Sequence, residues 1–229
     1  MTSPLELPIL PGRPSIRRQV NQVLRAALVS GQLRPGEVYS APMLAAQFGV
    51  SATPVREAMI DLVNEGLVVT SPNKGFVVRE LSPREMDEIT GIRRLLEIPT
   101  TVSVIGVPSS SDLAELRLLA QSIVTAAKDR DLVSFIRTDR EFHLKILALA
   151  GNAELVNLVG SLRDRARLYG IADLASSGEL DVTAREHLEI VDLLEAEDAV
   201  GLEELMHKHI GHIRDTWSDD GARTSSTNA

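Results

Sequence analysis

Residues 50–66 read VSATPVREAMIDLVNEG and predict an amphipathic helix that begins directly after a tight turn. Gly49 suits the turn, because glycine adopts backbone conformations that other residues resist. Ser51 or Thr53 can cap the helix, and Pro54 fits its first turn, where a missing N–H has no cost. Apolar side chains recur at helical spacing and predict a buried stripe formed by Val55, Met59, Leu62 and Val63.

The flanking segments extend this helix to a winged helix-turn-helix. Residues 41–47 predict the preceding helix of the motif. Residues 66–70 and 75–78 predict two short strands around a turn at 71–74, which together form the wing. Apolar residues at helical spacing predict one more helix over residues 15–30, ended by a glycine.

The motif places the N-terminal end of its second helix in the major groove of DNA. Thr53 and Arg56 lie at that end, off the apolar stripe, and Lys74 lies at the tip of the predicted wing. We therefore predict that these residues contact base edges and phosphates. An ordinary capped core helix is an equal alternative on spacing alone, because short helix-turn-helix patterns arise by chance.

Length and composition set the wider frame. The 229 residues predict two domains, and the lack of cysteine excludes disulfides and thiolate zinc sites. No apolar run approaches the ~20 residues of a membrane span, so no membrane partner is expected. The N-terminus lacks the basic and apolar regions of a signal peptide, so we expect a cytoplasmic protein.

The net charge of −8 divides unevenly along the chain. Residues 1–80 hold 8 Lys and Arg against 6 Asp and Glu, whereas residues 81–229 hold 16 against 26. The first part is therefore slightly basic, which fits a small DNA-binding surface attached to an acidic module. A solvated surface can carry the same small excess by chance.

The expected fold class is mainly α, with a winged helix-turn-helix domain over residues 14–80 and an all-α antiparallel bundle over 81–217. Ser82, Pro83 and Glu85 have the pattern of a capping box, which marks the start of the bundle. The bundle helices are predicted near residues 83–105, 112–128, 131–149, 153–171, 183–196 and 199–217. A flexible arm over 1–13 and a disordered polar tail over 218–229 are expected at the ends.

Two further features concern the helix starts and loops of the bundle. Thr183 and Glu186 have the spacing of a second capping box. Ser176 and Gly178 lie in a predicted loop of roughly a dozen residues, which is long enough for a mobile lid.

All five histidines lie in the second domain. Asp139 and His143 are four residues apart and project from the same face of a helix. Together with His187 and His209 from two other helices, they form a candidate metal site in the bundle core. Their nitrogen and carboxylate donors suit a divalent transition metal, with Zn favoured and Ni, Mn or Fe as alternatives. An Asp–His pair at this spacing is more often a surface hydrogen bond, and His207 and His212 are expected toward solvent or the helix end.

These motifs resemble the GntR superfamily of bacterial transcription regulators. The first domain carries the resemblance in residues 50–58 (VSATPVREA), 65–68 (EGLV) and 72–75 (PNKG). The second domain is similar to the all-helical FCD-type ligand-sensing domain of the FadR-like branch. It carries that resemblance in IRRLLE at 92–97, DREFH at 139–143, Gly151-Asn152, Glu186-His187 and MHKHI at 206–210.

The resemblance implies a homodimeric DNA-binding regulator, with repression favoured, that binds a pseudo-palindromic double-stranded DNA operator and a small carboxylic acid effector. It implies DNA contacts by Ser51, Thr53, Arg56 and Lys74, and metal ligation by Asp139, His143, His187 and His209. Arg93 occupies the family's arginine position in the first bundle helix and would pair with the effector's carboxylate through a bidentate fork. A surface salt bridge is the equal alternative for Arg93, and Arg163 and Arg167 are weaker candidates.

Two positions depart from the family pattern. Ala52 stands where the family usually has an arginine just after the turn, and Pro42 stands where an arginine is also common. A good bidentate base contact is worth about 1–3 kcal/mol of discrimination. We therefore expect a different operator or a weaker intrinsic affinity for DNA.

Two other functions stay open at this point. The bundle could be a metal-dependent enzyme tethered to DNA, with Asp139 and Glu141 as acid and base, or a regulator that its metal only stabilises. No further nucleophile or base motif accompanies the site, so we expect no enzymatic activity. In a regulator, the segment from Glu80 to Pro83 would transmit the effect of ligand binding.

Overall fold

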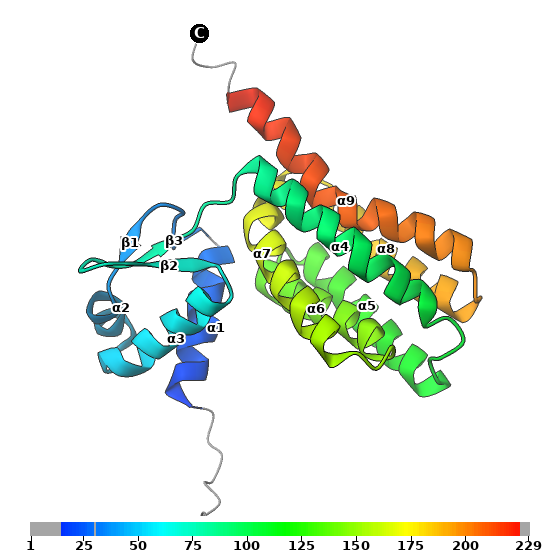
Figure 1. The fold of residues 1–229 in the computed structure, drawn as a ribbon, viewed down its shortest axis with the longest axis horizontal. Helices are drawn as coiled ribbons and strands as arrows, with labels where there is room; N and C mark the ends of the chain where they lie inside the picture. Colours follow the sequence, from blue (N-terminus) through cyan, green and yellow to red (C-terminus); the bar gives the residue numbers. More distant parts are fainter. Residues whose placement is uncertain (1–14, 30, 225–229) are drawn as a thin grey trace, which may run out of the picture.

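The computed structural model describes residues 15–29 and 31–224, which form a small winged domain and a larger helical bundle (Figure 1). Each part has its own cluster of buried apolar side chains. The mainly α fold class is confirmed. The arm predicted over residues 1–13 lies outside the described residues.

The winged domain consists of three helices and a three-stranded antiparallel sheet in the order β1-β3-β2. Its elements are α1 (Ile16–Val29), β1 (Val38–Tyr39), α2 (Ala41–Phe48), α3 (Ala52–Asn64), β2 (Val68–Ser71) and β3 (Gly75–Val78). Three residues of the predicted apolar stripe of α3, Val55, Met59 and Leu62, are buried in the core with Leu24 and Leu44, whereas the fourth, Val63, is only partly buried at its edge. The strand β1 was not predicted, because two residues are too few to show an alternating pattern.

Two glycines allow the close turns of this domain. Gly49 ends α2 with φ 65°, in the left-handed region that favours glycine, as the sequence predicted. Gly75 has φ 125°, and a Cβ atom there would lie 2.5 Å from the carbonyl oxygen of Tyr39. Ser51 holds the N-cap position of α3, although its side chain makes no capping hydrogen bond. The helix α3 therefore starts directly after a tight turn and packs against α1, α2 and β2.

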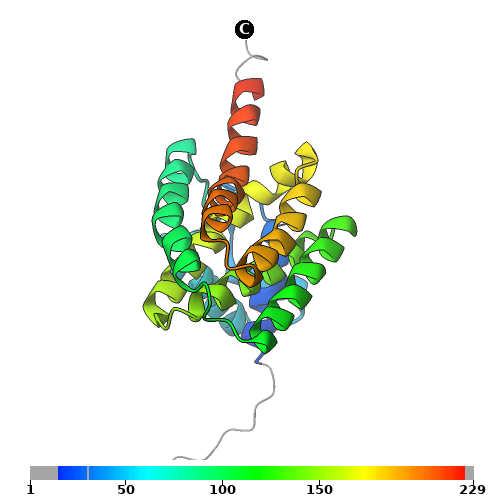
Figure 2. The ribbon, with the colours of Figure 1, turned by 90° about the vertical axis from the view of Figure 1, so that its right-hand side faces the viewer.

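The bundle is formed by six long helices within the described residues. They are α4 (Pro83–Ser103), α5 (Ser110–Lys128), α6 (Leu132–Ala148), α7 (Ala153–Ser177), α8 (Leu180–Glu195) and α9 (Ala199–Thr224). Figure 2 shows α9 between α4 and α8, and both helices pack against it. None of the helices in the described ranges combines the length and apolarity that a bilayer crossing requires.

Local capping signals fix several helix starts of the bundle. The capping box at Ser82 and Glu85 is confirmed, because each side chain bonds the backbone N–H of the other residue. Asp131 and Asn152 also cap their helices, through hydrogen bonds of 3.0 Å and 3.1 Å to the backbone N–H groups of Ser134 and Leu155. These starts agree with the sequence prediction to within about one residue.

The predicted loop and second capping box around residue 180 are wrong. The helix α7 continues to Ser177, and α8 begins at Leu180, so only two residues connect them. Gly178, with φ 86°, is sufficient for the reversal. Thr183 therefore lies inside α8, where its hydroxyl donates to the carbonyl of Glu179.

Part of the predicted disordered tail is helical, and residues 225–229 lie outside the described residues. The final helix continues through residues 218–224, which were assigned to the disordered tail. Adding residues to an existing helix needs no new nucleus, and this segment contains no proline to stop it. In Figure 1 the C-terminal part of α9 projects beyond the bundle.

Candidate metal centre and DNA-facing surface

Three helices bring together the four residues that were predicted as metal ligands. Asp139 and His143 come from α6, His187 from α8 and His209 from α9, and all four are buried. Each offers one donor atom, and these atoms lie within 4.8 Å of one another. This buried group of one aspartate and three histidines is one that could bind a metal ion.

The spacing of the donor atoms agrees with a shared ion. Nε2 of His143 lies 3.2 Å from Nε2 of His187 and 3.1 Å from Nε2 of His209. Oδ1 of Asp139 lies 3.1 Å from Nε2 of His187. Two ligands about 2.0–2.1 Å from a tetrahedral ion lie about 3.3–3.4 Å apart, which is close to these separations.

The hydrogen bonds on the outer sides of two rings determine which nitrogens carry protons. Nδ1 of His187 lies 3.0 Å from the carbonyl oxygen of Thr183, and Nδ1 of His209 lies 2.9 Å from a carboxylate oxygen of Glu186. Oxygens of these kinds accept hydrogen bonds, so both Nδ1 atoms must donate. In the neutral rings, both Nε2 lone pairs then point into the group, toward each other and the Asp139 carboxylate. A cation resolves this convergence of lone pairs, so the donor set fits a metal.

The environment of His143 favours its neutral form, which is the form that binds a metal. Burial, and after it the positive charge of Arg163, hold the pKa of His143 well below its usual value. The edge of the Phe142 ring meets the rings of His143 and His187, with centroids 5.2 Å and 5.0 Å apart. Apolar packing therefore orients the two rings and excludes water from one side of the group.

A buried network of charges adjoins the aspartate. Arg163 donates to Oδ2 of Asp139 at 2.9 Å and to Glu97, and Nε of Arg93 donates to Oε1 of Glu97 at 2.6 Å. Burial alone would raise the pKa of Glu97, but the charges of Arg163 and Arg93 lower it overall. Arg93 is thus a buried residue and not a surface cation, and its hydrogen bond to Glu97 joins it to Arg163, which bonds Asp139. The side chain of Arg167 lies outside the described residues.

Glu186 closes the other side of the group. It is buried and bonds His209, and its second oxygen lies 2.8 Å from Nε2 of His212 and 2.9 Å from Nζ of Lys208. Burial would raise the pKa of Glu186, but the hydrogen bonds from His209 and His212 lower it well below the usual value. His207 is exposed, as the helical spacing predicted.

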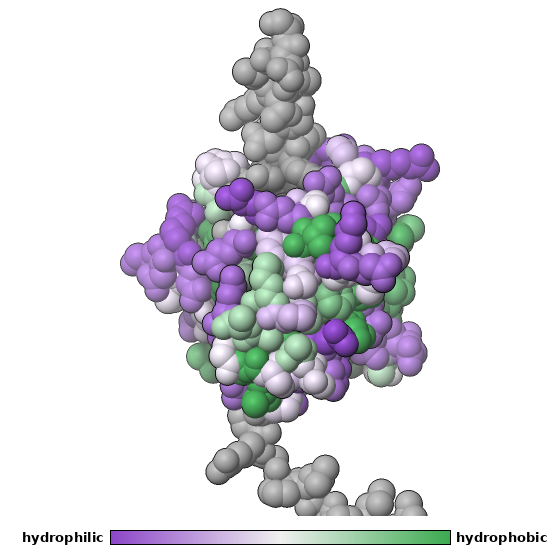
Figure 3. All heavy atoms as spheres, turned by 90° about the vertical axis from the view of Figure 1, so that its left-hand side faces the viewer, coloured by the Kyte–Doolittle hydropathy of each residue, from purple (hydrophilic) through white to green (hydrophobic). Residues whose placement is uncertain are grey.

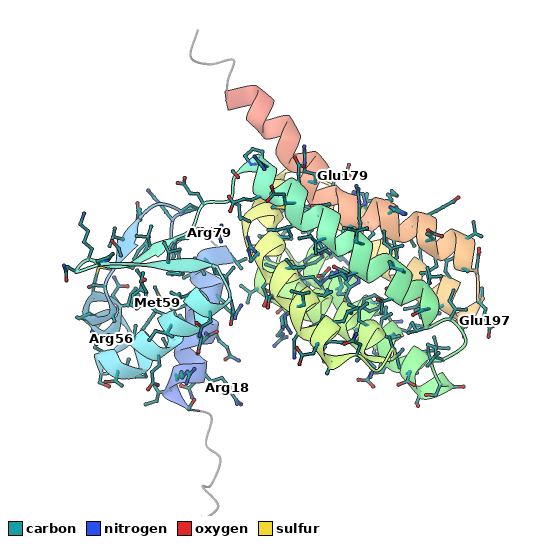
Figure 4. All side chains as sticks on the ribbon, viewed as in Figure 1. Arg18, Arg56, Met59, Arg79, Glu179 and Glu197 are labelled. Atoms are coloured by element: carbon teal, nitrogen blue, oxygen red, sulfur yellow. The ribbon has the colours of Figure 1, made fainter. Side chains whose placement is uncertain are left out.

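The predicted DNA contacts all lie on the surface of the winged domain. Ser51, Thr53, Arg56 and Lys74 are exposed. Figure 4 shows Arg56 on the side of α3 that faces away from the bundle, while Met59 lies toward the core. Among the described residues, neither Arg56 nor Lys74 forms an ion pair, whereas Arg17 and Arg25 of α1 are paired with Asp61 and Glu65. Figure 3, which faces this domain, shows hydrophilic side chains gathered mostly toward the rim of the view.

Two residues that shape the site, Glu97 and Glu186, were given no role there by the sequence, and Arg163 was predicted only as a weaker candidate for the effector's carboxylate. Glu97 follows Arg93 by four residues, so their pairing was visible as a helical spacing. The bonds of Arg163 to Glu97 and Asp139, and of Glu186 to His209, join residues from different helices. No local pattern in the sequence predicts such contacts.

An exposed recognition helix with a wing, joined to a separate bundle that encloses a polar group, defines a DNA-binding regulator of two domains. Comparison with known proteins agrees. The model for bacterial regulatory proteins of the gntR family matches residues 16–78, and the model for the FCD domain matches residues 88–212.

The relatives are regulators of the same kind. The chain is 32% identical to the HTH-type transcriptional regulator McbR of Escherichia coli K12, over 86% of this chain and 91% of McbR. It is 33% identical to the Nta operon transcriptional regulator of Aminobacter aminovorans, over 72% of this chain and 77% of that protein. The HTH-type transcriptional repressor RspR of Escherichia coli K12 is 26% identical, over 93% and 92% of the two chains.

A solved structure of McbR from Escherichia coli aligns with a TM-score of 0.75 at 28% identity, covering 90% of this chain and 99% of McbR. The chain belongs to the GntR family of bacterial transcription regulators and carries an FCD domain. It is a transcription regulator and not an enzyme, so the tethered-enzyme alternative is not supported.

Proposed function

We propose that this regulator is a homodimeric repressor of the FadR-like branch, whose affinity for its operator is set by a small carboxylic acid bound beside a divalent metal. The observation that carries the proposal is the convergence of four donor atoms within 4.8 Å, with the buried Arg163 bonded to one of them. Asp139, His143, His187 and His209 would hold the metal. Zn suits this donor set best, with Ni, Mn or Fe as alternatives.

The buried charges favour an anionic effector. Two buried arginines, Arg93 and Arg163, pair with the carboxylates of Glu97 and Asp139, and a third buried carboxylate, that of Glu186, bonds His209. A divalent ion would leave this group with a net positive charge, and buried charge is unfavourable unless it is compensated. A bound divalent metal would supply a Lewis-acid site for a carboxylate oxygen, and a carboxylate there would also supply the missing negative charge.

Arg163 is the arginine best placed to meet that carboxylate. Its two terminal nitrogens bond Glu97 and Asp139, and its Nε is buried without a hydrogen-bond partner among the described residues. A buried donor without a partner is costly, so an additional acceptor at this position is favourable. Arg93 remains a candidate, but its Nε is already bonded to Glu97.

The proposed DNA-binding mode uses one winged domain for each half of a pseudo-palindromic operator. In a two-fold symmetric dimer, each recognition helix enters one major groove, and the symmetry of the protein matches that of the operator. Ser51, Thr53, Arg56 and Lys74 are the proposed contacts, and Ala52 and Pro42 alter the sequence that is read. The name of RspR, a repressor, supports repression, and we place this activity in the cytoplasm.

The helix α7 offers a route from the effector site to the winged domain, in addition to the linker at residues 80–83. Arg163 bonds Asp139, one of the proposed metal ligands. The carboxylate of the next residue, Asp164, lies 3.8 Å from Nη1 of Arg25 on α1 and 3.0 Å from Nε of Arg140 on α6. Asp164, Arg25 and Arg140 border a cleft of about 740 Å3 between the two domains. An effector that moves Arg163 would therefore act on the domain contact directly.

Thermal unfolding tests the proposal. The full chain is measured after metal stripping and after reloading with Zn²⁺, against a panel of mono-, di- and hydroxy-carboxylic acids. A ligand at 100 times its dissociation constant adds about 2.7 kcal/mol, so one acid should raise the unfolding midpoint, and only in the metal-loaded protein.

Matched histidine variants provide the control. The His143→Ala variant should lose both the metal and the response to the acid, whereas His207→Ala, an exposed histidine on α9, should keep both. Stabilisation by metal without a response to any acid would support a regulator that its metal only stabilises. Full metal occupancy in His143→Ala would overturn the proposed ligand set.

A further inference from the structure

A carboxylate that does not belong to the four-residue group controls one of its histidines. Glu186 lies on α8, one residue before His187, and is only 1% exposed. Its Oε2 lies 2.9 Å from Nδ1 of His209, on the side of that ring opposite to the metal-facing nitrogen. Its Oε1 accepts from His212 and Lys208, two other residues of α9.

The direction of these hydrogen bonds determines the tautomer of His209. A neutral imidazole carries one proton, and an ionised carboxylate can only accept. A proton held on Nδ1 by Glu186 leaves the lone pair on Nε2, which lies 3.1 Å from Nε2 of His143. The same bond fixes the plane of the ring, because it restricts rotation about the side-chain bonds.

The corresponding support for His187 comes from its own helix. Nδ1 of His187 lies 3.0 Å and 3.2 Å from the carbonyl oxygens of Thr183 and Ala184, one turn earlier in α8. His209 instead depends on a side chain from another helix. Its orientation is therefore sensitive to a single substitution, and to the packing of α8 against α9.

We propose that Glu186 is a positioning residue for the metal centre, and that it sets both the tautomer and the orientation of His209. The proposal rests on the proposed metal site. His212 and Lys208 hold Glu186 in place from the outer side, and Lys208 is 59% exposed, so the chain of hydrogen bonds runs from the buried group to the surface. Carboxylates that orient metal-binding histidines in this way raise metal affinity about 10- to 100-fold.

The Glu186→Gln variant tests this role without changing the size of the side chain. Glu186 uses both oxygens as acceptors, whereas a glutamine amide has one acceptor and one donor. If the glutamine NH2 group points toward His209, it faces the N–H donor of that ring. If it points the other way, it faces the N–H donors of His212 and Lys208. We expect Zn²⁺ affinity, measured by competition with a chromophoric chelator, to fall about 10- to 100-fold. The matched control is Glu189→Gln, which removes the same charge at an exposed position of α8 and should bind Zn²⁺ like the wild type.

Nitrogen chemical shifts of the five histidines in the metal-free wild-type protein give a second measurement that needs no variant. We expect His209 to carry its proton on Nδ1 in the wild type, and expect a mixture of the two tautomers in Glu186→Gln, because only one orientation of the glutamine amide accepts a hydrogen bond from Nδ1. A wild-type His209 protonated on Nε2, or an unchanged Zn²⁺ affinity in Glu186→Gln, would overturn the assignment of Glu186. If the wild type itself binds none of Zn²⁺, Ni²⁺, Mn²⁺ and Fe²⁺, the metal centre as a whole is overturned, which is a different result from a failure of Glu186 alone.

Discussion

Arg93 and Arg84 form ion pairs of the same spacing on the same helix, but in opposite environments. Arg93 pairs with Glu97, and both side chains are at most 3% exposed. Arg84 pairs with Glu88, and both are more than half exposed. Removing one partner of a buried pair leaves an uncompensated charge in the core, whereas an exposed pair contributes little.

The two pairs therefore give a direct comparison of stability. Arg93→Ala should lower the free energy of unfolding by about 3–5 kcal/mol, because Glu97 keeps only Arg163 as its cationic partner. Arg84→Ala should lower it by less than about 0.5 kcal/mol. Urea unfolding of both variants measures the difference. Equal losses in the two variants would contradict the structural role of Arg93.

Arg56 is the residue of the recognition helix on which we expect DNA affinity to depend most. It is exposed, and among the described residues it has no ion-pair partner to compete with a phosphate or a base. Arg56→Ala should weaken operator binding by about 1–3 kcal/mol without altering metal content.

An operator selected from a random DNA library supplies the probe for this measurement, by fluorescence anisotropy. Arg18→Ala, on the exposed surface of α1, removes the same charge away from the recognition helix and serves as the control. If both variants lose the same affinity, the effect is a general change of charge and not a contact of Arg56.

At the scale of single residues, the sequence predicted the features that depend on residues close together in the chain. Asp139 and His143 share a helical face, so their pairing was predictable, and the exposed positions of Arg56 and Lys74 followed from the helix and the wing. The bond from Arg163 to Asp139 spans 24 residues, and the bond from Glu186 to His209 spans 23. Contacts of this kind depend on how whole helices pack, which periodicity alone does not reveal.

Among the elements, α6 has a helix start that depends on a charged group. The side chain of Asp131 accepts hydrogen bonds from Ser134, and these bonds lower the pKa of Asp131. A group whose pKa is lower in the folded state stabilises the protein above its unfolded pKa. That stabilisation is lost as the pH falls through the folded value.

The pH dependence of one substitution tests this cap. Asparagine also caps helices, so Asp131→Asn should be slightly less stable than the wild type near neutral pH, because it lacks the favourable interaction of an anion with the helix N-terminus. The difference should disappear as the pH falls below about 4. Urea unfolding at several pH values measures it. Asp129→Asn, at a neighbouring exposed position, is the control, and a difference for Asp131→Asn that does not change with pH would contradict the role of the charge.

Three of the helix starts that a cap marks were predicted, but the start of α5 was not, because its cap is Ser109 and Asp112 occupies the third helical position of that capping box. Ser82, Asp131 and Asn152 each bond a backbone N–H three residues later, and each start was predicted. The start of α8 has no side-chain capping hydrogen bond, and the spacing of Thr183 and Glu186 led to a false start. Glu186 has the spacing of a capping residue but makes its bonds to α9, which shows that a local pattern can be overridden by packing.

At the scale of the whole molecule, α7 connects the two domains. Three consecutive residues of this helix face different partners: Arg163 bonds Asp139, Asp164 pairs with Arg25, and the side chain of Arg165 lies against Gly66 of the winged domain. Asp164 is mostly buried, and this burial raises its pKa although Arg140 and Arg25 oppose the shift. The domain contact therefore combines these charged groups with apolar packing, because Val29 of α1 is buried in the apolar cluster of the bundle.

Removing the ion pair between Asp164 and Arg25 should make the position of the winged domain relative to the bundle more variable, without unfolding either domain. The chain has no cysteine, so two introduced cysteines, Lys74→Cys on the wing and Leu118→Cys on α5, can carry spin labels. We expect the distance distribution to broaden in Asp164→Asn. Asp192→Asn breaks an exposed ion pair with Arg117, which joins two helices of the bundle, and should leave the distance distribution between the spin labels unchanged. An unchanged distribution in Asp164→Asn would remove the ion pair as a determinant of domain position.

The position of Arg163, Asp164 and Arg165 on α7, between the bundle core and the winged domain, predicts a class of mutant alleles. If this helix carries the signal, alleles that bind the operator normally but ignore the effector should arise by substitution at Asp164 or at its partner Arg25, neither of which is a proposed metal ligand or a proposed DNA contact. In the proposed metal-binding dimer, such alleles would produce stable, metal-containing protein and would be recessive or dominant according to whether one unresponsive subunit is enough to hold the dimer on DNA. A screen for uninducible colonies would then map the path of the signal.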